Sequence, residues 1–283
     1  MDAGSGDGVK RGSAVDVRGL VAEWPVGSAA VVVVTPAGVV EALNDTVVHP
    51  WASVTKLVAA LTFLDAVGEG ELDLDEPAGP AGSTVRHLLA HTSGLPFEAD
   101  GPGAAVGARR LYSNVGFDVL AALLTSRTGE SFGEAARTRI LEPLEMTGSS
   151  IDGSAAKDGR GPAADLAILA GEMLQPRILD PETVRLGSTL AFPGLAGILP
   201  GFGRQSPNDW GLGFEIRDHK LPHWTGTRNS PATFGHFGQS GSFLWVDPVA
   251  SVACVSLSDR AFGPWAAQAW PVLSDAVLEA YGS

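Results

Sequence analysis

The stretch Ser53-Val54-Thr55-Lys56 heads a long apolar run from Leu57 to Gly68. The run has no proline and no interior glycine, and it is apolar on nearly every face, which predicts a buried helix. Pro50 disfavours helical geometry at the residue before it. Ser53 is therefore predicted at or near the N-terminus of the helix, where backbone N–H groups and the helix dipole favour negative charge.

Lys56 follows Ser53 by about one helical turn, so that its amine and the Ser53 hydroxyl share a face. A lysine near the start of a buried helix is unfavourable unless it has partners or a task, and a desolvated lysine with a lowered pKa can act as a base. The alternative is structural: Ser53 caps the helix and Lys56 extends to solvent. The tetrapeptide alone does not separate the two interpretations, because caps are common.

The composition indicates one large domain, or two lobes that share a core, in 283 residues. A net charge of −13 and a pI near 4.8 argue against nucleic acid and membrane surfaces as partners. The single cysteine, Cys254, lies in an apolar run and is predicted to be buried. The polar N-terminus shows no signal peptide and no transmembrane segment. We therefore expect a cytoplasmic protein with a small-molecule substrate, and the oligomeric state stays open.

Strand patterns lie at both ends of the chain and helix patterns in the middle. Strands are predicted over 29–35, 38–43, 210–216, 241–246 and 251–257, and helices over 84–91, 115–127, 131–140, 162–174 and 264–281. The Gly- and Ala-rich loop 97–110 is a candidate border of a pocket, and 177–203 has no assignment. The distribution predicts an α+β fold in which both chain ends form an antiparallel sheet flanked by helices, with an inserted, mostly helical lobe.

The predicted organisation has three parts. Residues 1–27 form a flexible N-terminal segment, residues 28–74 with 208–283 form the sheet lobe, and residues 75–207 form the helical lobe, with the active site between the lobes.

Two more motifs follow Ser53-x-x-Lys56 in chain order, Tyr112-Ser113-Asn114 and His236-Phe237-Gly238. With these motifs, and the stretches 87–95, 140–146, 210–213 and 235–238, the sequence resembles the serine β-lactamase and penicillin-binding superfamily. It is most similar to the branch that holds class C β-lactamases, D-alanyl-D-alanine carboxypeptidases, D-aminopeptidases and related carboxylesterases. The resemblance covers residues 28 to 280 and implies a β-lactamase/transpeptidase-like fold.

The resemblance implies three catalytic roles. Ser53 would be the nucleophile that forms an acyl-enzyme, and a serine hydroxyl at neutral pH needs a neighbouring base. Lys56 would accept or relay the proton, or hold Tyr112 as a phenolate. Tyr112 would be the general base or acid on the leaving-group side. Which of the two is the proton acceptor stays open.

The other implied site residues surround the substrate. Asn114 would hydrogen-bond Lys56 or a substrate carbonyl, and it is also a candidate helix cap. His236 takes the place of the lysine in the Lys-Thr-Gly motif of β-lactamases, and Phe237 takes the place of its hydroxyl-bearing residue. The backbone N–H groups of Ser53 and Gln239 would form the oxyanion hole. Gly238 would let the strand approach the substrate closely.

Two other features bear on the site. Arg228 is either a solvated loop charge or a contact for a substrate carboxylate. His219 and His223 are separated by Leu221 and Pro222, a spacing unsuited to a zinc helix. We expect no metal and no organic cofactor.

We therefore predict a serine hydrolase that acts through an acyl-enzyme on small esters or amides, as a carboxylesterase or D-peptidase would. The absence of Glu-x-x-Leu-Asn argues against the class A deacylation route, and the absence of a leader fits poorly with a cell-wall enzyme. His236, partly charged near neutral pH, and the apolar Phe237 disfavour carboxylate-bearing β-lactams. Two alternatives stay open: a weak or inactive member that binds ligands or assembles, and a true β-lactamase.

Overall fold

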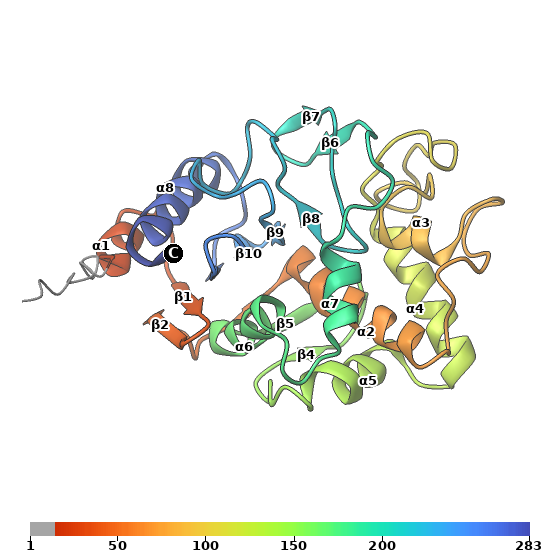
Figure 1. The fold of residues 1–283 in the computed structure, drawn as a ribbon, viewed down its shortest axis with the longest axis horizontal. Helices are drawn as coiled ribbons and strands as arrows, with labels where there is room; N and C mark the ends of the chain where they lie inside the picture. The colour runs from red at the N-terminus through yellow and green to blue at the C-terminus, as the bar shows by residue number, and fades with distance from the viewer. Residues whose placement is uncertain (1–14) are drawn as a thin grey trace, which may run out of the picture.

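A six-stranded antiparallel sheet in the order β2-β1-β11-β10-β9-β8 runs through the molecule (Figure 1). The computed structural model describes residues 15–283. The strands are β1 (Ala29–Thr35), β2 (Gly38–Leu43), β8 (Glu215–Ile216), β9 (Phe234–Gly238), β10 (Ser242–Asp247) and β11 (Val252–Ser258). Strands from the two parts of the chain meet where β1 pairs with β11, with Val32 opposite Val255. The predicted antiparallel sheet built from both chain ends is confirmed.

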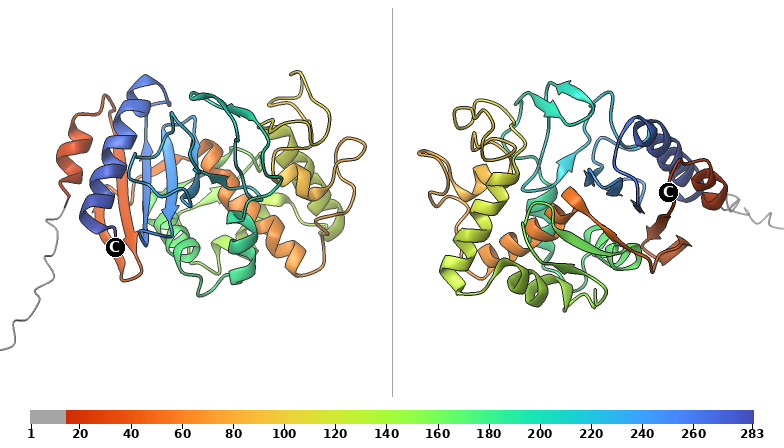
Figure 2. Two further views of the ribbon diagram at one scale, coloured as in Figure 1. Left: turned by 45° about the horizontal axis from the view of Figure 1, so that its top comes forward. Right: turned by 180° about the vertical axis from the view of Figure 1, so that it is seen from behind.

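Helices cover both faces of this sheet because side chains alternate across each strand. On one face, α1 (Val17–Ala22) and α8 (Pro264–Tyr281) pack over Val31, Val33 and the buried Cys254 (Figure 2). On the other face, α6 (Ala163–Leu174) packs on β1, β10 and β11. Helix α1 folds within the segment that was expected to be flexible, and residues 1–14 lie outside the described part.

The buried helix predicted from the first motif is α2 (Thr55–Gly68), preceded by a single 3-10 turn, η1 (Ala52–Val54). It packs against α4 (Asn114–Thr128), α5 (Phe132–Ala136) and α7 (Pro181–Ser188). The short α3 (Val85–Leu89) lies against α4. One hydrophobic core joins these helices to the inner face of the sheet. The sequence boundaries therefore do not separate two packing units, because α2 from the sheet segment lies among the helices and α6 from the helical segment lies on the sheet.

Two small sheets lie beside the helices. One has the order β3-β5-β4 and contains β3 (Val48–Pro50), β4 (Ser150–Ile151) and β5 (Gly159–Pro162). The other is the hairpin of β6 (Gly197–Leu199) and β7 (Gly203–Gln205), in the segment that had no assignment.

Two predicted elements differ from the structure. The strand expected over 210–216 shrinks to β8, since Gly213 has a φ of +97° and packs so closely that a Cβ there would lie 2.2 Å from the Ala60 Cβ. The helix expected over 131–140 divides into α5 and a π-helical turn, η2 (Arg137–Leu141). Close packing at Gly213, which periodicity does not report, decides the first case.

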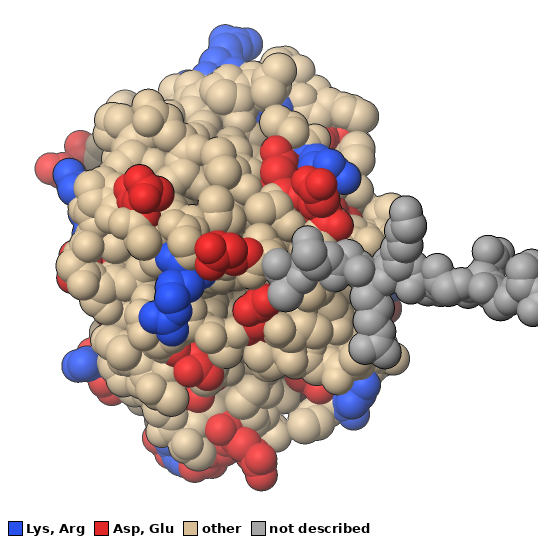
Figure 3. Space-filling model, turned by 90° about the vertical axis from the view of Figure 1, so that its left-hand side faces the viewer, with Lys and Arg blue, Asp and Glu red and all other residues tan. Residues whose placement is uncertain are grey.

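The excess of acidic residues is distributed over the surface. On the face that carries α1, Figure 3 shows separate groups of Asp and Glu side chains with fewer Lys and Arg side chains among them. Among residues 15–283, no helix combines the length and the apolar character needed to cross a membrane.

Candidate active site

The backbone before Ser53 is held from two sides. The Trp51 indole N–H donates to the Gly161 carbonyl of β5 at 3.2 Å, and the Trp51 carbonyl accepts a hydrogen bond from the Ser242 hydroxyl of β10 at 2.7 Å. Ala52 has a φ of +45°, an unfavourable conformation for a non-glycine residue. Helix α2 has no side-chain cap, so the Ser53 hydroxyl is not used for capping. The two hydrogen bonds of Trp51 and the strained backbone of Ala52 fix the position of Ser53 at the start of α2.

Lys56 is fully buried, so the structural alternative in which it extends to solvent is wrong. Its Nζ donates to Asn114 Oδ1 at 2.7 Å and to the Ala156 carbonyl at 2.9 Å, and it lies 4.6 Å from the centre of the Tyr112 ring. Burial lowers the pKa of Lys56 well below its usual value, although the charges of Asp118 and Glu98 oppose the shift. A neutral amine has two protons, both used by these acceptors, and one lone pair that remains free.

The hydrogen bonds of His236 determine which of its ring nitrogens carries a proton and which accepts one from Tyr112. His236 Nδ1 lies 2.6 Å from the Phe237 carbonyl, which can only accept, so Nδ1 carries the proton. Burial, with the nearby Lys56, lowers the pKa of His236 to about 3, so the ring is neutral and its Nε2 is an acceptor. The Tyr112 hydroxyl, 3.3 Å away, therefore donates to Nε2.

The Tyr112 hydroxyl is protonated in the resting site. Burial raises its pKa above the usual value, and a hydrogen bond with the Ser53 side chain only partly offsets the shift. This favours a neutral phenol that accepts from Ser53 and donates to His236. The lysine amine is the better candidate for the resting base.

Asn114 occupies the first turn of α4 but is not its cap. The cap is Ser113, whose hydroxyl accepts from the Gly116 N–H at 2.9 Å. The Asn114 Nδ2 donates to Glu98 Oε1 at 2.9 Å while its Oδ1 accepts from Lys56. Both ends of the amide are engaged, so Asn114 orients Lys56 in this state.

A cavity of about 330 Å³ opens beside Ser53 and is lined by Tyr112, His236 and Gln239. Its other walls are largely apolar and come from Phe97, Ile198, Leu199, Pro200, Trp210, Glu215 and Phe237. Gly238 brings β9 against η1, because a Cβ there would lie 2.3 Å from the Trp51 carbonyl oxygen. The close approach that Gly238 allows is therefore to the backbone before Ser53, whereas the resemblance implied a close approach to the substrate.

The sequence matches the Beta-lactamase family over residues 17–278. The chain belongs to the β-lactamase family. A β-lactamase from Mycobacterium bovis is 50% identical, with a TM-score of 0.91 over 94% of this chain and 99% of that chain. A curated β-lactamase from Escherichia coli K12 is 28% identical over 127 residues, which span 35% of this chain and 34% of that relative's length.

More distant structures share the fold of this family member. Simvastatin synthase (LovD) from Aspergillus terreus is 16% identical with a TM-score of 0.76, over 93% of this chain and 96% of that chain. EstCE1, a hydrolase with promiscuous acyltransferase activity, is 18% identical with a TM-score of 0.74, over 92% and 96% of the two chains. Membership of the β-lactamase family supports a serine-hydrolase type of function.

Two residues predicted to contact the substrate, Arg228 and Phe237, make other contacts in this family member. Arg228 does not line the cavity: it is exposed and lies 3.7 Å from Glu279 of α8. Phe237 lines the cavity but also packs in an aromatic cluster with Phe262 and Trp270, at centroid distances of 4.9 and 6.0 Å. Within the described residues, no group of three or more His, Cys, Asp or Glu side chains is arranged to hold a metal ion.

Sequence reasoning missed two residues that support the site. His91, in the stretch 87–95, accepts a hydrogen bond from the Ser113 N–H at 3.1 Å and packs 4.6 Å from the Tyr112 ring, so it orients the tyrosine. Glu215 lies in the cavity wall, and its Oε1 is hydrogen-bonded to Lys220 Nζ at 2.7 Å and to His223 Nε2 at 3.0 Å. His223, considered from the sequence only as a metal ligand, thus belongs to a buried hydrogen-bonded group with Glu215 and Lys220.

Proposed function

We propose that this protein is a serine hydrolase that cleaves small esters or amides with an uncharged acyl part through an acyl-Ser53 intermediate. The observation that carries the proposal is the buried Lys56 amine, which lies one helical turn after Ser53 and gives both of its neutral-state protons to Asn114 and the Ala156 carbonyl. Such an amine has a lone pair available for the serine proton.

In the proposed reaction, Ser53 Oγ attacks the substrate carbonyl carbon, and its proton passes to Lys56, directly or through the Tyr112 hydroxyl. The carbonyl oxygen takes the electron pair and is stabilised by the N–H groups of Ser53 and Gln239. Collapse of the intermediate breaks the bond to the leaving group, which takes the proton back. Water then attacks the carbonyl carbon of the acyl-enzyme, and its proton passes to Lys56 in the same way. Ser53 Oγ leaves, takes this proton back, and the acid is released.

A fluorophosphonate probe is expected to add once, at Ser53, because activation requires the adjacent base. Tryptic mass spectrometry locates the adduct, and hydrolysis of p-nitrophenyl butyrate measures activity. Ser53→Ala should lose the adduct and the turnover, while Ser126→Ala, on the exposed face of α4, should keep both. An adduct elsewhere, or full turnover by Ser53→Ala, contradicts the proposal. No turnover by the wild-type protein would favour the alternative of an inactive binding protein.

The wild-type protein is expected to hydrolyse p-nitrophenyl butyrate with a kcat/KM at least about tenfold above that for a chromogenic cephalosporin. The neutral His236 supplies no charge to a carboxylate beside the scissile bond, Arg228 lies outside the cavity, and Glu215 adds a carboxylate to its wall. Steady-state kinetics with both substrates test this. Equal efficiency on the cephalosporin would favour a true β-lactamase.

Tyr112→Phe is expected to lower kcat by roughly 10²-fold, because it removes a hydroxyl that can relay a proton between Ser53 and the leaving group. The ring still packs against His91, so the melting temperature should change little. Stopped-flow and steady-state rates on p-nitrophenyl butyrate measure the effect. A variant with a wild-type kcat would remove Tyr112 from the proton path and leave Lys56 alone in it.

A further inference from the structure

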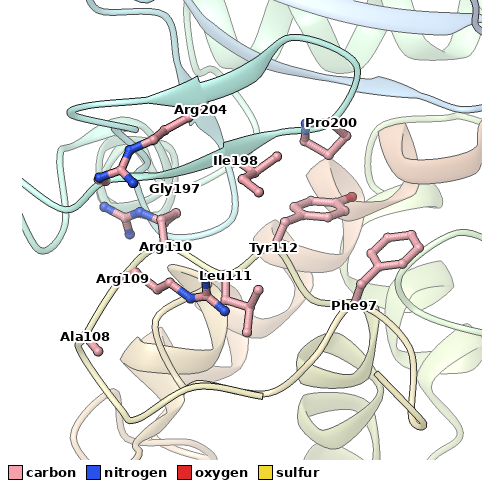
Figure 4. A pocket seen from close by; sticks show the side chains of 11 residues that line it. Phe97, Ala108, Arg109, Arg110, Leu111, Tyr112, Gly197, Ile198, Pro200 and Arg204 are labelled. Atoms are coloured by element: carbon pink, nitrogen blue, oxygen red, sulfur yellow. The ribbon is translucent and has the colours of Figure 1, made fainter. Parts of the chain in front are cut away.

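A second and larger pocket, of about 560 Å³, adjoins the cavity, and Figure 4 shows the residues that line it. Four residues line both spaces: Phe97, Tyr112, Ile198 and Pro200. The rest of the pocket wall comes from two segments, 108–111 and 196–204. Ser53 and Gln239 line only the first cavity, so the two spaces meet at Tyr112.

The charge of this pocket is opposite to that of the chain. The sequence has 32 acidic and 19 basic residues, yet the pocket lining has three arginines, Arg109, Arg110 and Arg204, and no acidic side chain. Arg110 is buried and donates to backbone carbonyls, among them those of Ala90 and Asn208. Carbonyls satisfy its hydrogen bonds, and the nearby charge of Asp209 partly balances its own. The pocket is therefore a positive site on an acidic protein.

Arg109 and Arg204 are both exposed, and within residues 15–283 neither forms an ion pair. Elsewhere on the described surface the exposed arginines are of both kinds, since Arg127 and Arg137 lie against carboxylates whereas Arg18 forms no ion pair. Arg109 and Arg204 are set apart by lining the same pocket. In Figure 4 Arg204 and Arg110 lie at one end of the pocket, Arg109 extends beside Leu111, and Tyr112 and Phe97 lie at the other end. A guanidinium matches the geometry of a carboxylate or phosphate, with which it can form two parallel hydrogen bonds.

We propose that this pocket binds the leaving-group part of the substrate, and that this part ends in a carboxylate or phosphate held by Arg109 and Arg204. The inference rests on the proposed function, in which Tyr112 lies on the leaving-group side of the scissile bond. Two residues separate Arg109 from Tyr112 along the chain, so their Cα atoms lie at most about 11 Å apart. An apolar arm of that length would lie along Ile198 and Pro200 between the two ends of the pocket.

This anion site differs from a contact with a β-lactam carboxylate. That group lies directly beside the reacting bond, where His236 is neutral. The arginines are placed for an anion at the far end of an arm, so poor turnover of cephalosporins and preference for an anionic leaving group are compatible.

The test compares two butyrate esters that differ only in the far end of the leaving group, 8-hydroxyoctanoate and the neutral 8-hydroxyoctanamide. Wild-type kcat/KM is expected to be on the order of tenfold higher for the carboxylate ester, and the ratio should fall as salt is added. The butyrate ester of 8-hydroxyoctyl phosphate is the second anionic probe, and the larger of the two ratios identifies the preferred anion.

Arg109→Gln and Arg204→Gln should each lower the ratio, and the double variant should bring it to about one. Arg18→Gln, which removes an exposed arginine from α1, is the control and should keep the wild-type ratio. Turnover of p-nitrophenyl butyrate should not change in Arg18→Gln. Each arginine variant of the pocket is judged by the ratio of the two esters measured on that same variant, so that a general loss of activity cancels. A wild-type ratio near one, or a preference that survives the double substitution, overturns the inference.

Two further measurements keep this result separate from the proposed function. The p-nitrophenyl monoester of octanedioic acid carries its carboxylate on the acyl side, so an arginine-dependent preference for it over p-nitrophenyl octanoate would overturn the assignment to the leaving group. If no ester is turned over, the proposed function fails, but calorimetric titration of the 8-hydroxyoctanoate and 8-hydroxyoctanamide esters still tests the pocket. Tighter, arginine-dependent binding of the anion supports it, and equal binding overturns it.

Discussion

Replacing Lys56 by methionine is expected to lower kcat on p-nitrophenyl butyrate by roughly 10³-fold or more, the scale of a lost general base at an activated nucleophile. Methionine keeps the unbranched, apolar stem in the core but has no basic nitrogen. Circular dichroism and a thermal melt should show a folded protein, so that the loss is one of chemistry. A variant that keeps a wild-type kcat would remove Lys56 from the mechanism.

The hydrogen bonds of the two buried lysines explain why Lys56 is assigned as the base. Lys220 donates to three acceptors, the Glu215 carboxylate and the carbonyls of Asp209 and Ile216, which suits a charged ammonium with three protons. Lys56 donates to two neutral acceptors and contacts no carboxylate. The first arrangement stabilises a cation, and the second favours an amine with a free lone pair.

The pH dependence of kcat/KM provides an independent check on this assignment. Burial lowers the pKa of Lys56, so kcat/KM should rise with pH through a value below the usual pKa of lysine, and activity should be lost as the amine gains a proton. His236, with its pKa lowered to about 3, should add no limb near pH 6.5. Lys56→Met and Tyr112→Phe should not combine additively, because the two groups handle one proton.

Local patterns predicted the sheet from both chain ends and the buried helix α2, with Ser53 and Lys56 on one face at its start. That Tyr112 and His236 lie beside this helix was implied by the resemblance to the β-lactamase superfamily, because no pattern within either motif relates it to a segment more than 50 residues away. The structure brings these side chains together.

Other features depend on contacts between distant segments, which no local pattern encodes. The partner of Asn114 is Glu98 from the loop 97–110, and the neutral state of His236 follows from burial. Arg228 could not be excluded from the site by sequence because its place depends on how its loop meets α8. The strand predicted over 210–216 was wrong for most of its length because Gly213 packs directly on Ala60.

The largest effect on stability is expected from Lys220→Met. The lysine Nζ lies 2.7 Å from Glu215 Oε1, and their side chains are 0% and 2% exposed. Burial acts to raise the pKa of the Glu215 carboxyl, but the charges and hydrogen bonds of Lys220 and His223 outweigh it and hold the pKa well below its usual value. Removing the lysine leaves a buried carboxylate without its main counter-charge, which should lower the free energy of unfolding by about 3 to 5 kcal/mol.

The same pair sets the direction of the pH dependence. Because the folded-state pKa of Glu215 is lowered, its contribution to stability is present above the unfolded value, about 4.3, and is lost as the pH falls below it. In Lys220→Met the Glu215 carboxylate loses its main stabilising charge, so its folded-state pKa rises. The free energy of unfolding of this variant should therefore decrease less on acidification than that of the wild-type protein. Urea unfolding of both proteins from pH 7 down to about pH 2 measures the difference.

Two further variants make the stability prediction decisive. Lys157→Met removes an exposed lysine that lies 3.5 Å from Glu98, and an exposed pair is worth at most about 1 kcal/mol. The double variant Glu215→Gln/Lys220→Met removes both charges at nearly constant volume, and the buried glutamine keeps partners in His223 and Trp224. It should be more stable than Lys220→Met alone, because no unpaired charge remains. If Lys220→Met unfolds at the same urea concentration as Lys157→Met, the buried pair does not hold this wall of the cavity in place.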